Sequence, residues 1–372
     1  MNKALLAIFA VSLLLIAGVI GFMLGDDETD DSTATPVPVT GTTGDTTVTD
    51  ETASAGIADL VSGKLRLDGL NLTAYTAEGY SDAKVHDDLD RIKGIGSNAV
   101  TIVPTWYMKN TSANSVRPNS NKSPSDTSLE SAIGYAKDIG LKVILKPHID
   151  VIDDTFRGDI QPADRTKWFS SYESFIGFYA DFAAKVEADL FAVGTELKSL
   201  SGDTDPWRQI VAAVRGKYSG PLTYAANWDE VDQVQFWDDL DLIGVDAYYP
   251  LASEGQTPTE EDLVAAWATP IGNLEATSDR WGKPILLTEI GYPTQADAAA
   301  HPFEVREGEP EDQAAQATAY RAAFEAFADV DWLRGMNWWA WRADPSNSEN
   351  LAIDYPPEDK EAEDVLAENQ PG

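Results

Sequence analysis

The sequence of 372 residues contains no cysteine and only three histidines, at positions 86, 148 and 301. Without cysteine the chain has no disulfide framework, no thiolate metal site and no thioether lipid anchor. Three histidines are also too few for the multi-histidine centres of metal-dependent hydrolases. We therefore expect neither a catalytic metal nor a cofactor.

Basic residues are scarce as well, with 27 Lys and Arg against 62 Asp and Glu and a formal net charge of −35. Such an acidic surface repels nucleic acid, so nucleic-acid binding is excluded as a function. The same surface suits solubility in concentrated salt, because screening reduces self-repulsion and hydrated carboxylates keep the surface wet. We therefore predict a halophilic source.

The one long uncharged apolar run covers residues 4–25, and its 22 residues exceed the length of about 20 that crosses a bilayer as a helix. Lys3 precedes the run and DDETDD follows it, so the positive-inside tendency places the amino terminus in the cytoplasm. We predict residues 1–25 to be a membrane anchor, or a signal segment if they are cleaved. The folded part would then be extracytoplasmic at the cell membrane, or secreted.

The ends of the chain lack apolar periodicity. Residues 26–60 are rich in Thr and Asp and cannot bury enough apolar surface to fold alone, so they are predicted to form a disordered linker. Residues 357–372 are predicted to be an acidic tail of similar character.

From residue 64 to residue 356 short β-like runs alternate with longer helical patterns, which predicts a single α/β domain. Eight strands are predicted, at 66–75, 99–107, 142–150, 190–197, 221–228, 240–249, 284–292 and 333–341. Apolar residues at three and four spacing predict helices between them, among others at 128–140, 168–187, 206–218 and 311–330. Eight such units predict a (β/α)8 TIM barrel. An open doubly wound sheet is disfavoured because no glycine-rich phosphate loop follows the first strand.

Active sites of TIM barrels lie at the carboxyl ends of the strands, so polar and aromatic residues there are candidates. Polar groups and rings together suit a neutral polyhydroxylated ligand, that is, a polysaccharide or oligosaccharide. The candidate substrate-binding residues are Asn71, Trp106, Lys146, His148, Asn227, Trp228, Asp246, Trp339 and Trp341. Spacing of two places Trp339 and Trp341 on one face of the last strand, where a core role and a sugar platform are equally open.

Two of these strand ends carry the same dipeptide, Thr195-Glu196 and Thr288-Glu289. Two carboxyl groups that face each other across a barrel mouth can cleave a glycosidic bond. Tyr248 could then hydrogen-bond a nucleophilic glutamate and keep it ionised. Each glutamate could instead be a helix cap or a member of an ion pair.

Two other function classes stay open at this point. The barrel could be a carbohydrate-binding surface protein without catalytic activity. Alternatively, Lys146 could form a Schiff base, as in barrel lyases and aldolases.

Four motifs in order, VGTEL, DLIGVDAYYPL, KPILLTEIGYPT and MNWWAW, resemble glycoside hydrolase family 113, a clan A retaining group known for endo-β-1,4-mannanase activity. The resemblance covers about residues 64–356. It implies that Glu196 is the acid/base, that Glu289 is the nucleophile and that Tyr248 supports the nucleophile. It further implies that Trp339 lines the central subsite, and that sugar is contacted by His148, Asn227 and Trp228.

One position departs from the wider clan. The common signature before the acid/base is asparagine, which binds the sugar 2-hydroxyl, whereas this chain has Thr195. Either the shorter threonine hydroxyl does that work or another residue, such as Asn227, takes it over. The segments 151–167 and 295–310 are expected to wall the cleft.

Overall fold

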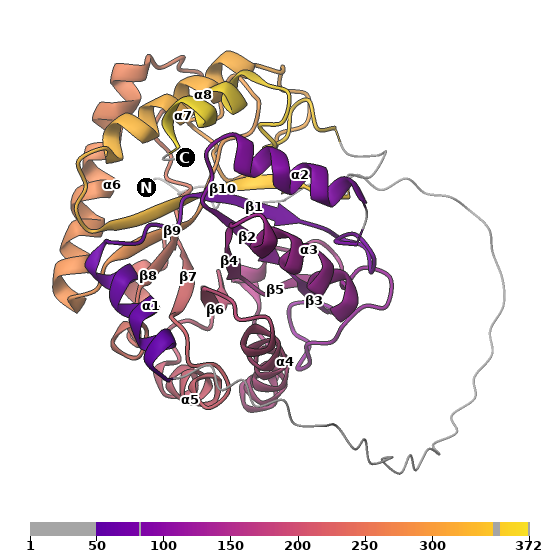
Figure 1. Cartoon of the computed structure of the whole chain (residues 1–372). Helices are drawn as coiled ribbons and strands as arrows, with labels where there is room; N and C mark the ends of the chain where they lie inside the picture. The colour runs from indigo at the N-terminus through magenta and orange to yellow at the C-terminus, as the bar shows by residue number, and fades with distance from the viewer. Residues whose placement is uncertain (1–49, 82, 345–349, 371–372) are drawn as a thin grey trace, which may run out of the picture.

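The computed structural model describes residues 50–81, 83–344 and 350–370. Eight parallel strands form a closed barrel in the order β1-β10-β9-β8-β7-β6-β4-β2, which confirms the predicted TIM barrel (Figure 1). The barrel strands are β1 (Gly69–Thr73), β2 (Ala99–Val103), β4 (Lys142–Leu145), β6 (Leu190–Thr195), β7 (Leu222–Asn227), β8 (Ile243–Asp246), β9 (Ile285–Ile290) and β10 (Leu333–Arg342).

Two of the predicted strands are each divided by a proline. Pro104 separates β2 from β3 (Thr105–Met108), and Pro147 separates β4 from β5 (His148–Val151). Proline has no N–H for a sheet ladder, so the barrel pairing stops at these positions. Beyond them β3 and β5 pair with each other in a separate two-stranded sheet. This small sheet extends one side of the barrel and brings His148 above the strand ends.

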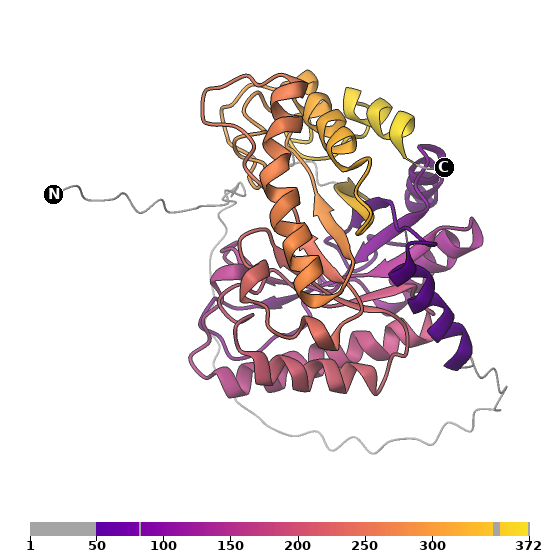
Figure 2. The ribbon, with the colours of Figure 1, turned by 90° about the vertical axis from the view of Figure 1, so that its left-hand side faces the viewer.

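Helices cover the outside of the barrel. They are α2 (Ala83–Gly94), α3 (Asp126–Asp138), α4 (Arg165–Lys185), α5 (Thr204–Arg215), α6 (Glu260–Trp281) and α7 (Gln313–Phe327). Ser125, Asp164, Thr259 and Asp312 begin four of them by accepting a hydrogen bond from the third backbone N–H of the helix. The long helices α6 and α7 lie side by side on one flank (Figure 2). Between β7 and β8 the chain forms only the short turns η2 (Val231–Gln233) and η3 (Trp237–Asp239).

The predicted acidic tail is corrected by the structure, because most of it is helix α8 (Glu361–Asn369). Ala362, Val365 and Leu366 are buried at three and four spacing, and α8 packs beside α7 (Figure 1). Its outer face is tied to α2, where Arg91 is ion-paired with Glu363. The helix therefore completes the ring after β10, and the folded domain continues past residue 356. The high acidic content hid an amphipathic pattern that is only nine residues long.

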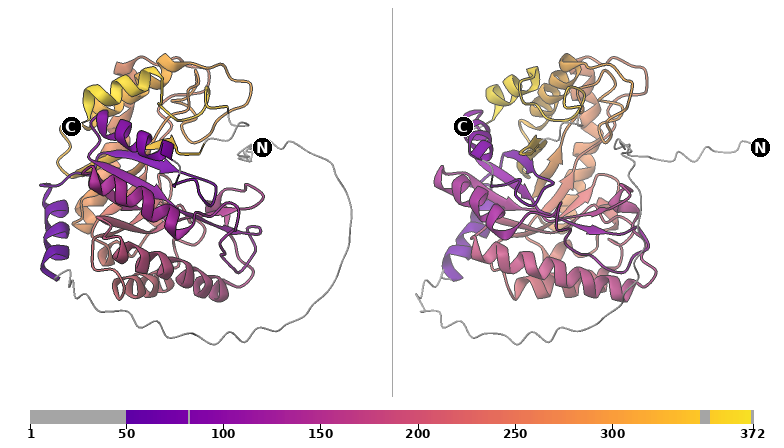
Figure 3. Two further views of the ribbon diagram at one scale, coloured as in Figure 1. Left: turned by 45° about the vertical axis from the view of Figure 1, so that its right-hand side comes forward. Right: turned by 90° about the vertical axis from the view of Figure 1, so that its right-hand side faces the viewer.

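The predicted linker 26–60 is corrected at its carboxyl end, because residues 50–62 form helix α1 (Asp50–Ser62). Leu60 is buried in a cluster with Leu67 and with residues from the starts of the strands, Ala99, Ile144, Leu190, Leu242 and Leu286. Helix α1 therefore covers the amino-terminal end of the barrel. Figure 3 shows it at the end opposite to the long loops that follow the strands.

The predicted membrane segment, residues 1–25, lies outside the described residues, as do residues 26–49 of the linker. Among the helices of the described part, none combines the length and apolar character needed to cross a bilayer.

Candidate active site

The strand register brings three predicted residues into one row at the carboxyl ends of neighbouring strands. Asn227 on β7 is opposite Asp246 on β8, and Asp246 is opposite Glu289 on β9. Glu196 comes directly after β6, the next strand of the ring. The row therefore runs from one predicted catalytic glutamate to the other, with β7 and β8 between them.

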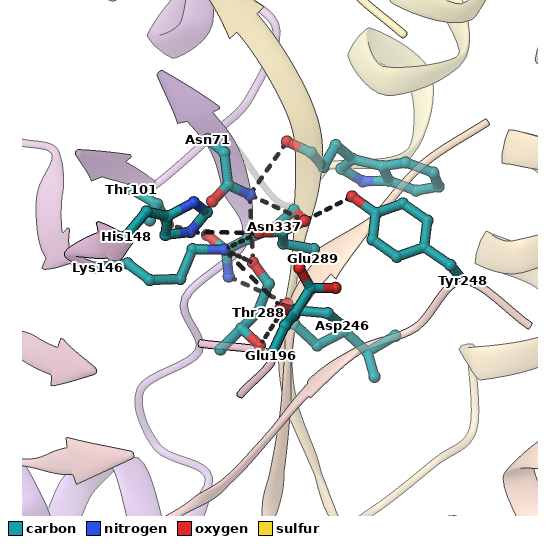
Figure 4. A network of polar contacts seen from close by, with 12 residues as sticks. Asn71, Thr101, Lys146, His148, Glu196, Asp246, Tyr248, Thr288, Glu289 and Asn337 are labelled. Carbon is teal, nitrogen blue, oxygen red and sulfur yellow. Dashed lines mark hydrogen bonds and ion pairs between the residues drawn. The ribbon is translucent and has the colours of Figure 1, made fainter. Parts of the chain in front are cut away.

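Glu289 is 3 % exposed and is held by two donors from different sides. The Tyr248 hydroxyl donates to its Oε2 at 2.6 Å, and the Lys146 ammonium donates to its Oε1 (Figure 4). His148 Nε2 lies 3.6 Å from the same Oε1. Each carboxylate oxygen of Glu289 therefore has a donor of its own, the hydroxyl on one side and the ammonium on the other. The hydrogen bond expected between Tyr248 and the glutamate is thus present in the structure.

Glu196 lies beside this network, and its environment differs (Figure 4). Its backbone is in the left-handed region with a φ of 53°, which is uncommon for a residue other than glycine. Burial raises the pKa of the Glu196 carboxyl to about 7, a rise to which the charge of Glu289 adds and which Arg157 opposes. Left-handed non-glycine residues concentrate at functional sites, because the surrounding structure must hold them there.

Arg157 is the site residue that sequence reasoning missed. Its Nη1 donates to Glu196 Oε2 at 2.6 Å, its Nη2 donates to Asp150 Oδ1 at 2.7 Å, and its Nε donates to the Ile149 carbonyl at 3.0 Å. Arg157 belongs to the segment 151–167 that was expected only to wall the cleft. A lone arginine in a loop carries no spacing signal, because its partner Glu196, directly after β6, is 39 residues away in the chain.

Removal of the Arg157 charge is expected to move the pH profile. If Glu196 is the general acid of a glycosidase, as the family resemblance implies, it must be protonated, so kcat/KM falls as pH rises through its pKa of about 7. Arg157→Gln removes a cation that favours ionisation, so this basic limb should move up by on the order of one pH unit. Arg208→Gln is the matched control. Arg208 also bridges two carboxylates, those of Asp238 and Asp239, but it belongs to helix α5 and does not contact Glu196. A limb that stays in place in Arg157→Gln would contradict the assignment.

Trp339 forms one wall of the site together with His148 and Lys146. The rings of Trp339 and His148 are almost parallel, with an interplanar angle of 7° and centroids 5.8 Å apart. The Lys146 ammonium lies 5.5 Å from the centroid of the Trp339 ring. Burial, followed by the charges of Arg157 and Lys146, holds the pKa of His148 well below its ordinary value. His148 is therefore a neutral ring, and its buried Nε2 makes no hydrogen bond with the described residues.

Asp246 and Asn71 lie deeper in the barrel. Asp246 Oδ1 accepts from Thr288 Oγ1 at 2.7 Å and lies 3.9 Å from the Lys146 ammonium. Burial raises the pKa of Asp246 well above its ordinary value, and the charge of Glu289 adds to this rise. The Lys146 ammonium is therefore paired mainly with Glu289. The Asn71 amide donates to the carbonyls of Thr288 and Asn337, both at 3.2 Å, and so ties β1 to β9 and β10 (Figure 4). Both residues are fully buried, so they support the site from below.

The prediction that Trp339 and Trp341 share a face is wrong. Leu70 and Leu72 of β1 pair with Trp338 and Trp341 of β10, so β10 contains one residue more than β1 over this interval. This bulge breaks the alternation of the strand. Trp341 is therefore fully buried on the helix side, where the Arg91 guanidinium lies 5.3 Å from its ring centroid.

Trp106 also lies away from the predicted mouth. It belongs to β3, beyond the proline that ends the barrel strand, and its ring packs against Phe175, Phe178 and Tyr179 of α4. The sequence position was read as a strand end, but the division of the strand turns the side chain to the outside. Neither Trp106 nor Trp341 belongs to the cluster around Glu289.

Trp228 and Asn227 stay at the mouth. Trp228 is partly exposed, and its backbone N–H donates to the Asp246 carbonyl at 3.0 Å. Its ring centroid lies 5.6 Å from that of Tyr249. Asn227 Oδ1 accepts from the Trp228 N–H at 2.9 Å, which fixes the orientation of the amide. The hydroxyl of Thr195 is buried without a hydrogen-bond partner among the described residues, so it keeps its capacity for a ligand.

The Schiff-base alternative is disfavoured by the surroundings of Lys146. The ammonium is ion-paired with Glu289, whereas Schiff-base formation needs a neutral amine. In the described part of the chain no group of three or more acidic or histidine side chains is arranged to hold a metal ion.

The sequence also matches a known protein family. Residues 73–356 match the sequence model of Glycoside Hydrolase Family 113. The chain belongs to this family. It is therefore a glycosidase, and the alternative of a silent binding protein is set aside. No match is found among curated proteins.

Solved structures of family 113 β-1,4-mannanases are similar to this family 113 chain. One of them shares 26 % identity with a TM-score of 0.75, covering 82 % of this chain and 98 % of its own. The β-mannanase AaManA from Alicyclobacillus acidocaldarius, in complex with ManMIm, shares 26 % identity with a TM-score of 0.74 and the same coverage. A β-glucuronidase from Ruminococcus gnavus, 13 % identical with a TM-score of 0.57, is similar in fold alone; 82 % of this chain and 49 % of that chain are covered.

Proposed function

We propose that this protein is a retaining glycoside hydrolase in which Glu196 is the acid/base and Glu289 is the nucleophile. In the first step protonated Glu196 gives its proton to the leaving oxygen while the Glu289 carboxylate attacks the anomeric carbon. In the second step the Glu196 carboxylate takes a proton from water, which attacks the glycosyl-enzyme and releases Glu289.

The observation that carries this proposal is the difference between the environments of the two carboxyl groups. Glu289 accepts hydrogen bonds from Tyr248 and Lys146, which suits a nucleophile that must be ionised. Glu196 is buried and has a pKa of about 7, which suits a group that must be protonated at the start. Two carboxyl groups held in such different environments are the usual mark of distinct acid and nucleophile roles.

For the substrate we propose a β-1,4-linked mannan or a related β-linked polysaccharide. Two similar structures that share 26 % identity with this chain are β-1,4-mannanases. Trp339 and Trp228 are partly exposed at the mouth and can stack on sugar rings. Donors and acceptors for the sugar hydroxyls would come from His148, Asn227 and Thr195.

The test is product analysis with the purified full chain on mannan, glucan, xylan and galactan. We expect reducing ends to appear with mannan, and NMR of the first products to show the β-anomer before mutarotation. Appearance of the α-anomer first would contradict the retaining mechanism. Release from glucan or xylan without mannan would overturn the substrate but leave the mechanism in place.

Two further predictions concern the setting of the enzyme. We propose that residues 1–25 attach the protein to a membrane with the barrel outside the cytoplasm, which fractionation of cells that express the full chain would test. We also propose that the net charge of −35 adapts the protein to concentrated salt. Activity that is highest without salt and lost in molar salt would count against this adaptation.

A further inference from the structure

The backbone on the carboxyl side of Glu196 is held by a tyrosine from the next strand. The Leu197 N–H donates to the Tyr224 hydroxyl at 2.9 Å, and on the other side the Glu196 N–H donates to the Ala225 carbonyl at 2.8 Å. Both peptide groups that flank the left-handed Glu196 are therefore bound to neighbouring residues of β7. A left-handed non-glycine residue persists only where its surroundings fix it, so these two bonds define where the Glu196 side chain points.

Tyr224 is itself fixed by its packing. It is fully buried, and its ring packs edge-on against the rings of Trp207 and Phe236, with centroids 5.2 and 5.5 Å away. It also lies against Gly194, where a Cβ would be 2.7 Å from Tyr224 Cε2. The glycine in the VGTEL motif thus makes room for the ring. Tyr224 therefore packs on the side of the sheet that faces Trp207 of α5.

Glu230 is a buried carboxyl group near Tyr224. Burial, with the charge of Glu230 second, raises the pKa of the Tyr224 hydroxyl well above its ordinary value, so the hydroxyl stays protonated while it accepts from the Leu197 N–H. Glu230 is fully buried in the turn after β7, where its N–H donates to the Asn227 carbonyl at 2.9 Å.

We propose that Tyr224 is a positioning residue that holds the acid/base Glu196 toward the glycosidic oxygen. This inference rests on the proposed function, because it needs Glu196 to be the proton donor. The chain of contacts runs from the Tyr224 hydroxyl to the Leu197 peptide and then to Glu196. Loss of the hydroxyl frees that peptide and lets Glu196 leave the geometry in which it can protonate the leaving group.

The test is Tyr224→Phe, assayed on two substrates that differ in their need for an acid. A mannan oligosaccharide has a sugar leaving group that must be protonated, whereas a dinitrophenyl β-mannoside leaves without help. Acid/base catalysis contributes about 10²- to 10⁴-fold, so misplacement of Glu196 should lower kcat/KM for the oligosaccharide by at least about tenfold. For the dinitrophenyl glycoside kcat/KM should change by less than about twofold, because it reports the first bond cleavage alone.

Tyr218→Phe is the matched control. The Tyr218 hydroxyl is also buried and donates to a carbonyl, that of Ala188 at 2.6 Å, but it lies before β7, away from the mouth. It should change neither rate. Equal losses on both substrates in Tyr224→Phe, or no loss, would overturn the positioning role. If Tyr224→Phe does not fold, Gly194→Ala, whose Cβ would press on the Tyr224 ring, should give the same split between substrates.

The proposed function is tested separately by the wild-type protein in the same assay. A wild type that cleaves neither substrate refutes the glycosidase assignment to mannosides, whatever the variants do. An active wild type with an unchanged Tyr224→Phe refutes only the positioning role.

Discussion

Glu289→Ala is expected to lower kcat on mannan by at least about 10⁴-fold, because it removes the proposed nucleophile, the group that would form the covalent intermediate. The loss should not be repaired by an activated leaving group, since the attacking atom itself is absent. The Tyr248 hydroxyl and the Lys146 ammonium would remain in place and would lose the carboxylate that both contact. Rates are measured by reducing-sugar release, and folding is checked by circular dichroism.

The control for this variant is Glu275→Ala, which removes an exposed glutamate on α6. It should keep the full rate. An isosteric Glu289→Gln variant separates charge from shape, because it preserves the volume of the side chain but cannot attack the anomeric carbon. Wild-type activity in either Glu289 variant would sink the nucleophile assignment.

Glu196→Ala is expected to behave differently. It should lower kcat/KM on mannan by about 10² to 10⁴-fold, yet retain most of it on a dinitrophenyl β-mannoside. With that substrate the glycosyl-enzyme should accumulate, since no base activates water. Added azide needs no base, so it should restore turnover and yield a β-mannosyl azide, which mass spectrometry and NMR identify.

An α-mannosyl azide from the Glu196→Ala variant would mean that azide attacks the substrate directly, without a covalent intermediate. In that case Glu289 would not be the nucleophile of a retaining enzyme. A variant that loses activity equally on both substrates and gains nothing from azide would instead show that Glu196 has a structural role. The two glutamate variants therefore separate the two roles.

The architecture could be predicted from sequence because each strand is a compact apolar run. All eight barrel strands lie where alternation and turn residues place them. The misreadings came from the ends of the chain. The acidic residues of α8 outnumber the three side chains that it buries, so its composition predicts a tail, and the composition of α1 predicts part of a polar linker. In both cases packing against a distant partner decides the structure, and a local composition cannot show that partner.

Part of the site can be predicted from the sequence, for a reason that applies to TIM barrels in general. Residues at the ends of strands, such as Glu289, Tyr248 and Lys146, meet because parallel strands share one edge. Residues that depend on a local irregularity were misplaced: Trp341 by the extra residue in β10, and Trp106 by Pro104. Arg157 was missed because a loop sets its position. Side chains within regular strands are thus predictable, whereas bulges and loops need the structure.

Helix α1 covers the barrel from the side where the strands begin, and Leu60 is buried in that floor. The floor and helix α1 therefore lie at the pole opposite to Glu196 and Glu289. A long glycan can thus lie across the open rim without meeting α1.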